Sequence, residues 1–158
     1  MRTIAEIVKR QLGPQLEMVR DALDACPDSA FEDGEIGLRE HLYHTLIGVD
    51  VWFTEDIFAY PFDQIVDQEA GNLRAPANEK VTKSYMLEYA NRMIEKMHNL
   101  PEGNAAYLDP TVLRGQEFTM LDRCIGQFRH VQHHLGVFNE RMRAHGLSTV
   151  PWKGFGES

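Results

Sequence analysis

The chain has 158 residues, the size of one domain, and its formal net charge is −8. A chain this acidic, without a basic stripe, repels nucleic-acid phosphates and anionic membranes, so neither is an expected partner. The N-terminal residues carry no signal-peptide pattern, and no apolar run is long enough to span a membrane. We therefore expect one cytoplasmic domain over residues 1–158, with an irregular tail from about residue 147.

A long helix is expected at the start of the chain, over residues 3–25. Thr3 and Glu6 have the spacing of a capping box, which marks a helix N-terminus. Gly13 and Pro14 should kink or break this helix, because proline has no amide hydrogen and its ring clashes with the preceding turn.

The second expected helix covers residues 35–57 and contains a long apolar stretch. This stretch, LYHTLIGVDVWF, is apolar almost all round, which indicates burial on most faces. His44 and Asp50 lie inside it, and buried polar side chains need partners. Residues 58–81 follow as a long loop rich in Pro, Asn, Asp and Gly, with a short helical turn expected near residues 62–68.

Two more helices are expected in the second half of the chain. The third covers residues 82–100 and the fourth residues 119–145. Thr119 and Asp122 have capping-box spacing at the start of the fourth helix. Gly146 follows its end, at the position where glycine is favoured.

Four helices around one core predict an all-α protein, a four-helix bundle. A short connection joins the first two helices, whereas the long loop between the second and third can cross the bundle. An up-down-down-up path is then open to the chain, and it would leave the second and fourth helices antiparallel. The second helix is more apolar than one bundle core requires, so we also expect a homodimer.

The fourth helix carries a pair of histidines with metal-ligand spacing. His130 and His134 are four residues apart and stack on one helix face, so both can hold one divalent metal. A solvated or capping pair has the same spacing. The metalloprotease pattern H-E-x-x-H is absent. The single E-x-x-H motif, Glu95 to His98, is interpreted as a polar helix end rather than as half of a di-metal site.

His44 is the predicted third ligand. An imidazole within an apolar helix is costly unless it is hydrogen-bonded or ligated, and a hydrogen-bonded core histidine is the alternative interpretation. Three histidines leave an open coordination position, as in catalytic zinc sites. Zinc is the first expected metal and nickel the next. His41 is the second-choice ligand. His133 is expected either to be exposed or to contact one of the metal-ligating histidines without touching the metal.

Two segments resemble a known family. LREHLYH, residues 38–44, resembles the R-E-x-L-x-H segment of the DinB-like superfamily (DNA-damage-inducible, YfiT-type four-helix bundles). HVQHHLG, residues 130–136, resembles that family's H-x-x-x-H-x-G segment. The resemblance implies an up-down-down-up bundle, commonly dimeric, with one divalent metal held by His44, His130 and His134.

Characterised members of this family include enzymes that depend on low-molecular-weight thiols, so the resemblance also implies a thiol cofactor. We therefore expect transfer of such a thiol to a small electrophilic substrate. A metal-dependent hydrolase is one alternative, and a non-catalytic metal-binding or stress-related dimeric bundle is another. Cys26 and Cys124 lie far apart and in no motif, so they are expected to be reduced, buried thiols rather than nucleophiles.

Two glycines predict a pocket beside the metal. Gly48 follows His44 by one turn and Gly126 precedes His130 by about one turn, on nearly the same faces. In antiparallel helices both glycines fall on the same side of the metal, although close helix packing is another reason for two glycines. Arg123 shares the face of His130, and its guanidinium matches a substrate carboxylate; a surface arginine paired with a nearby acid is the alternative interpretation. The full predicted pocket consists of Gly48, Val51, Trp52, Glu55, Arg123, Gly126 and Gln127.

Overall fold

The computed structural model describes residues 2–32, 36–54, 56–100, 108–109, 113 and 118–154. Within these residues the regular secondary structure is helical, apart from one isolated bridge between Leu113 and Thr119. The expectation of an all-α protein is confirmed for this part of the chain. The α-helices are α1 (Ile4–Ala25), α2 (Asp28–Phe31), α3 (Leu38–Trp52), α4 (Gln68–Gly71), α5 (Lys83–His98) and α6 (Met120–Ala144). Two short 3-10 helices, η1 (Ile57–Ala59) and η2 (Phe62–Gln64), lie between α3 and α4.

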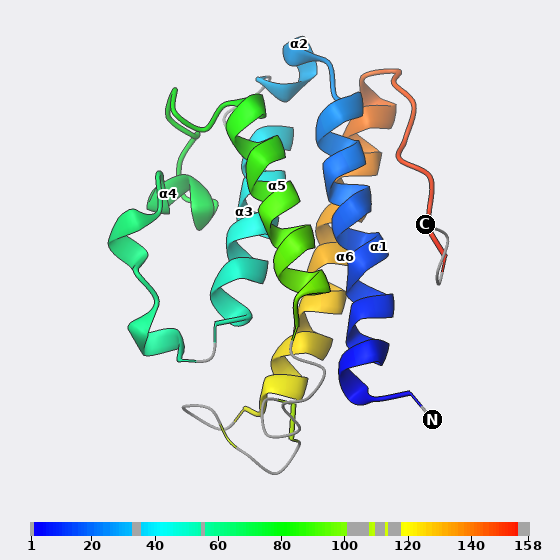
Figure 1. Cartoon of the computed structure of the whole chain (residues 1–158). Coiled ribbons are helices and arrows are strands. Elements are labelled where there is room, and N and C mark those ends of the chain that lie inside the picture. Colours follow the sequence, from blue (N-terminus) through cyan, green and yellow to red (C-terminus); the bar gives the residue numbers. More distant parts are fainter. Residues whose placement is uncertain are drawn as a thin grey trace.

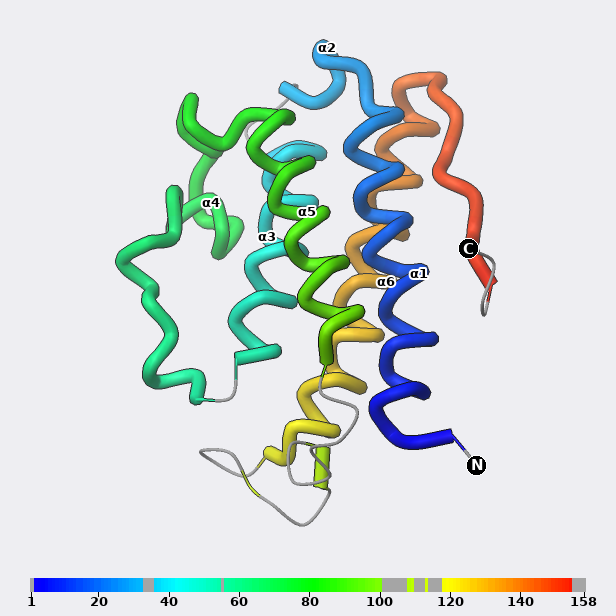
Figure 2. Tube along the Cα trace, in the orientation of Figure 1, coloured from blue at the N-terminus to red at the C-terminus, as the bar shows by residue number. Residues whose placement is uncertain are grey.

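The long helices α1, α3, α5 and α6 lie side by side (Figure 1). α1 and α6 run in one direction and α3 and α5 in the other, as the colours of the trace show (Figure 2). α1 packs against α5 and α6, and α3 packs against α6 and α5. The segment from η1 to α4 lies beside this group and contacts α3. The side of α3 that faces α6 is therefore separate from the side that faces this segment.

Helix α1 starts where its local sequence predicts. The Thr3 hydroxyl accepts the amide hydrogen of Glu6, and the Glu6 carboxylate accepts that of Thr3, which is the predicted capping box. Of the kink or break expected at Gly13 and Pro14, the break does not occur: α1 continues through both residues from Ile4 to Ala25. Leu12 and Leu16, on either side of the proline, are fully buried, so their packing offsets the hydrogen bond that Pro14 cannot make.

Helix α3 is shorter than predicted at its C-terminal end. It ends at Trp52, not near residue 57. The Thr54 hydroxyl donates to the carbonyl oxygen of Asp50, and Asp56 caps the separate helix η1. Short polar side chains compete for backbone groups in this way, which ends the helix before the apolar pattern does.

Helices α5 and α6 begin and end close to the predicted residues. Thr82 caps α5, and Thr119 and Asp122 form the capping box of α6. Gly146 follows α6 with a φ of 70°, the left-handed conformation expected of glycine after a helix. The N-terminal ends depend on local side-chain hydrogen bonds and the C-terminal end of α6 on a local glycine, which is why the sequence alone predicts them.

The apolar surface of α3 is covered by the same chain. α6, α5 and α4 each pack against it, and Gly71 of α4 lies directly against the Ile47 side chain. The surplus apolar surface that favoured a homodimer therefore lies inside one chain, and the dimer itself stays a prediction.

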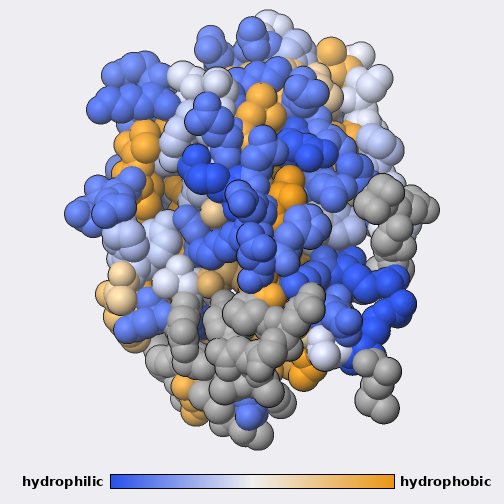
Figure 3. All heavy atoms as spheres, viewed as in Figure 1, coloured by the Kyte–Doolittle hydropathy of each residue, from blue (hydrophilic) through white to orange (hydrophobic). Residues whose placement is uncertain are grey.

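The visible outer surface of α5 and α1 is mostly hydrophilic (Figure 3). Some large apolar side chains are exposed elsewhere, with Phe58 and Trp152 the most accessible. Among the helices described, none is both long enough and apolar enough to cross a membrane.

Candidate metal centre

Three histidines come together where α3 packs against α6. His44 comes from α3, and His130 and His134 come from successive turns of α6. One ligand nitrogen of each residue lies within 4.8 Å of those of the other two. The centroids of their rings are 4.7 to 4.9 Å apart. The three histidines that the sequence singled out therefore lie close enough together to hold one metal ion.

A backbone carbonyl orients His44. Its Nδ1 lies 2.7 Å from the carbonyl oxygen of Gly71, and it must be the donor because a carbonyl can only accept. The lone pair of a neutral ring is then on Nε2, the atom that lies next to His130. Histidines that ligate metals usually donate their second nitrogen in this way. His44 therefore has the tautomer of a metal ligand.

The contact between His44 and His130 is the observation that best fits a metal. Their Nε2 atoms lie 3.0 Å apart. Nδ1 of His130 lies 3.0 Å from Oε1 of Gln127, and in this amide orientation it donates to that oxygen. Both Nε2 atoms of the neutral rings then carry lone pairs that face each other. Such a pair needs a cation or a proton between the two nitrogens.

Burial makes a proton the less favourable of these two. Burial, together with the neighbouring His44 and His133, lowers the pKa of His130 to about 4. Burial and the surrounding histidines together lower the pKa of His134 to about 3. Near neutral pH these imidazoles are therefore uncharged, the form that binds metals. The donor set fits a divalent cation.

The two second-choice histidines flank His134. Nδ1 of His41 lies 3.1 Å from Nδ1 of His134, so one of these nitrogens donates to the other. Nη2 of Arg141 lies 3.5 Å from the far nitrogen of His41. His41 is therefore placed to orient the His134 ring by this hydrogen bond, and it is not one of the three clustered histidines. His133 is exposed, with its ring centroid 5.0 Å from that of His134.

Gly48 allows the ring of His130 to approach α3. A Cβ at this position would lie 2.5 Å from Cε1 of His130, so the ring would have to move. We expect Gly48→Ala to weaken zinc binding by about 10- to 100-fold. Disturbing the groups that orient a metal-ligating histidine usually has an effect of this size. Zinc titration against a competing chelator measures this loss. The protein should stay folded, because the clash involves the end of one side chain.

Gly126→Ala is the matched control for this prediction. No atom outside its own stretch of helix lies within 4 Å of a Cβ at Gly126. The substitution should therefore leave zinc affinity unchanged and raise stability by about 1 kcal/mol, because alanine favours a helix interior. Unchanged zinc affinity in Gly48→Ala would contradict this position of the His130 ring.

A cavity of about 310 Å³ opens beside the cluster, between α3 and α6. His44 and His130 form part of its wall, and the glycines Gly48 and Gly126 both line it. A small molecule in this cavity would reach two of the three histidines. The other lining residues are Trp52, Phe118, Asp122, Arg123, Gln127 and Arg129.

The cavity differs from the predicted pocket at a few positions. Val51 is not part of its wall but lies in the hydrophobic core, and Glu55 lies outside the described residues. Asp122 and Arg129 line the cavity without having been predicted. Helical spacing relative to Gly126 is the signal that could have found both, since they lie four residues before and three after it.

The cysteines take no part in this site. Cys26 and Cys124 are free and buried, as predicted. Burial raises the pKa of both thiols, that of Cys124 to about 12, so neither is a thiolate near neutral pH.

Comparison of the chain with protein-family models, with curated proteins and with solved structures finds no match. The histidine cluster and the cavity beside it are therefore the structural basis for assigning a function.

Proposed function

We propose that this chain is a metal-dependent enzyme of the DinB-like superfamily that transfers a low-molecular-weight thiol to a small electrophile. One observation carries the proposal: two of three clustered histidines are also part of the wall of a cavity. The directions and packing of the four long helices support an up-down-down-up four-helix bundle, the fold of that family. The homodimer belongs to the same proposal, and a sedimentation run giving only monomer at high concentration would remove it.

His44, His130 and His134 would hold the metal, zinc first and nickel next. When bound, the metal supplies a Lewis acid that lowers the pKa of a neighbouring thiol or water. Gly71 and Gln127 hold two of the rings by hydrogen bonds to their second nitrogens. The chain thereby presents two oriented imidazoles, those of His44 and His130, at the cavity wall, with His134 beside them.

Arg123 is placed to hold a substrate carboxylate in the cavity. Its side chain is buried, and Nη1 donates to the carbonyl oxygen of Thr54 at 3.2 Å. Its Cζ lies 5.8 Å from the centroid of the Trp52 ring. These contacts keep the guanidinium at the cavity wall, where its planar fork matches a carboxylate. We therefore propose that one of the two substrates, the thiol or the electrophile, carries a carboxylate group.

Arg123→Gln should raise KM for a carboxylate-bearing substrate by about 10- to 100-fold, the effect of losing a charged hydrogen bond. A neutral analogue should show little change. Arg129→Gln is the matched control, because Arg129 lines the same cavity but is exposed, so solvent screens its charge. Equal effects of the two substitutions on KM would contradict the role of Arg123.

The test of the function is turnover by zinc- or nickel-loaded protein with a panel of low-molecular-weight thiols and a chromogenic electrophile. Turnover that needs both metal and thiol, and that His130→Ala abolishes, is the expected result. Hydrolysis of a chromogenic ester without thiol would replace the proposal by a metal-dependent hydrolase. No turnover at full metal occupancy with any thiol or ester would leave a non-catalytic metal-binding protein.

A further inference from the structure

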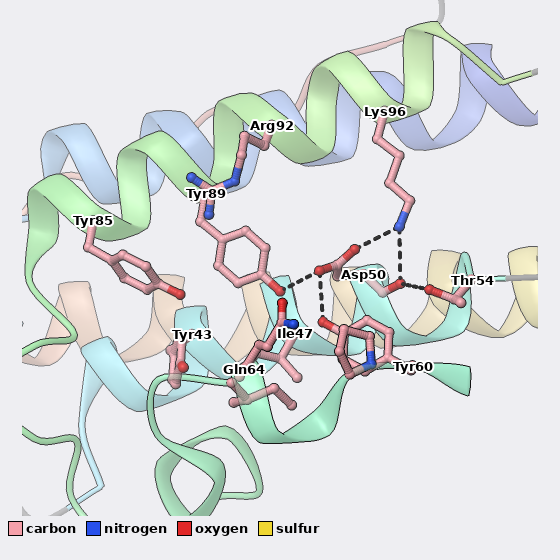
Figure 4. Close-up of a pocket in the computed structure, with 12 residues that line it drawn as sticks. Tyr43, Ile47, Asp50, Thr54, Tyr60, Gln64, Tyr85, Tyr89, Arg92 and Lys96 are labelled. Atoms are coloured by element: carbon pink, nitrogen blue, oxygen red, sulfur yellow. Dashed lines mark hydrogen bonds and ion pairs between the residues drawn. The ribbon is translucent and has the colours of Figure 1, made fainter. Parts of the chain in front are cut away.

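A second cavity lies on the other side of α3, away from the histidine cluster. It measures about 380 Å³ and lies between α3, α5 and the segment that carries η1 and η2 (Figure 4). Residues 43, 47 and 50 of α3 line it, whereas residues 44, 48 and 52 line the cavity beside the histidines. Four of the chain's five tyrosines line this second cavity: Tyr43, Tyr60, Tyr85 and Tyr89.

Asp50 ties the elements around this cavity together. The hydroxyls of Tyr60 and Tyr89 each donate to Oδ2 at 2.9 Å, and Nζ of Lys96 donates to Oδ1 at 2.7 Å (Figure 4). Burial and the neighbouring Asp50 charge raise the pKa of Tyr60 to about 12 and also raise that of Tyr89, so both stay neutral donors. Both oxygens of Asp50 are engaged, so this carboxylate is not the group that would bind a cationic ligand.

Arg92 is the cation that remains for a ligand. It lies on α5 one turn before Lys96, and its Cζ is 5.0 Å from the centroid of the Tyr89 ring. In the described part of the chain Arg92 forms no ion pair, whereas Lys96 pairs with Asp50. The lining therefore carries one net positive charge, which favours a ligand with one negative charge.

The remaining wall suits a flat apolar body. Ile47, Pro61 and Ile65 line the cavity together with the tyrosine rings. The rings of Tyr85 and Tyr89 are 5.9 Å apart between centroids and tilted by 51°. Aliphatic side chains and ring faces of this kind pack well against an aromatic ring. The rest of the lining is polar, with Thr54 and Gln64 beside Asp50, Arg92 and Lys96, so the cavity suits a ligand that has both a ring and a polar group.

We propose that this cavity binds a small aromatic carboxylate. Its acid group would pair with the guanidinium of Arg92, because the planar fork of arginine matches a carboxylate. Its ring would lie among the tyrosines and Ile47, on the side of α3 away from the histidines. The site shares no lining residue with the cavity beside the metal centre, so it does not depend on the proposed function.

Benzoate is the probe, added to zinc-loaded, full-length protein in which the tyrosine rings are isotopically labelled for NMR. Among the residues that the structure describes, no tyrosine lines the cavity beside the histidines, so shifts of the assigned Tyr43, Tyr60, Tyr85 and Tyr89 signals report on this site. We expect saturable shifts with benzoate. Neutral benzamide should bind about 2- to 5-fold more weakly, because it lacks the charge that pairs with the exposed Arg92.

Arg92→Gln should weaken benzoate binding by about 2- to 5-fold, because Arg92 is exposed and solvent screens its pairing with the carboxylate. Arg74→Gln is the matched control: Arg74 is exposed like Arg92 and the substitution changes the net charge equally, but Arg74 does not line the cavity, so the benzoate affinity of this variant should equal that of the wild type. Three results would overturn the proposal: no tyrosine shift with benzoate, equal binding of benzamide, or equal benzoate affinity in Arg92→Gln. Binding lost in Arg123→Gln but kept in Arg92→Gln would place the acid in the other cavity, which also overturns it.

Discussion

Alanine at both His44 and His130 should abolish stoichiometric metal binding. Their Nε2 atoms lie 3.0 Å apart, so a single ion would bind to both, and the double variant keeps one of the three histidines. One imidazole cannot chelate an ion, so zinc affinity should fall by more than about 1,000-fold, which is about 4 kcal/mol of the roughly 10–16 kcal/mol typical of structural zinc sites. Zinc titration against a competing chelator measures the change.

His133→Ala is the control for this double variant. His133 lies beside His134 on α6 but is exposed and outside the group of three. Its removal should change zinc affinity little. A His44→Ala, His130→Ala protein that still holds one zinc per chain would show that the ligands lie elsewhere.

Glu40→Ala should cause the largest loss of stability. The Glu40 carboxylate is buried and accepts hydrogen bonds from the backbone amides of Gly37 at 2.8 Å and Ala77 at 2.9 Å, and from Nε of Arg39 at 3.0 Å. Its removal leaves these donors without their acceptor, which should cost about 3–5 kcal/mol in the free energy of unfolding. Urea denaturation of metal-free protein measures this loss.

Glu40→Gln should cost less, about 1–2 kcal/mol, because an amide oxygen can still accept one of these bonds. Glu88→Ala on α5 removes an exposed carboxylate and should stay within about 0.5 kcal/mol of the wild type. A Glu40→Ala protein as stable as Glu88→Ala would contradict the structural role of the buried carboxylate.

The contribution of Glu40 should also depend on pH. Burial alone would raise its pKa, but the hydrogen bonds from Ala77, Gly37 and Arg39 outweigh burial and hold the pKa below the usual 4.5. The folded protein therefore binds this proton less readily than the unfolded chain does. The stability that Glu40 adds is complete above pH 4.5 and is lost as the pH falls through the lower folded pKa. The difference in unfolding free energy between wild type and Glu40→Gln should shrink over that acidic range.

Local chemistry explains which parts of the fold the sequence predicts. The capping boxes at Thr3 and Thr119 lie within four residues of the helix ends that they define, and both are found as predicted. Helix α3 ends at Trp52, several residues before its predicted end at residue 57. The apolar pattern continues past Trp52, while the polar side chains of Thr54 and Asp56 bond to the backbone and end the helix.

Contacts between distant segments explain what the sequence does not predict. The spacing of His130 and His134 and the apolar surroundings of His44 were enough to identify the cluster. The carbonyl of Gly71 that orients His44 is 27 residues away, and any residue type could supply it. The partner of Glu40 at Ala77 is 37 residues away and is likewise a backbone group. No sequence pattern marks such partners.

The central claim is that His44, His130 and His134 together hold one divalent metal. X-ray absorption at the metal edge, on zinc-loaded protein of known metal content, tests it most directly. We predict one zinc ion per chain and a scattering pattern that requires three imidazole ligands. A metal content well below one per chain, or a spectrum explained without three imidazoles, would contradict the claim.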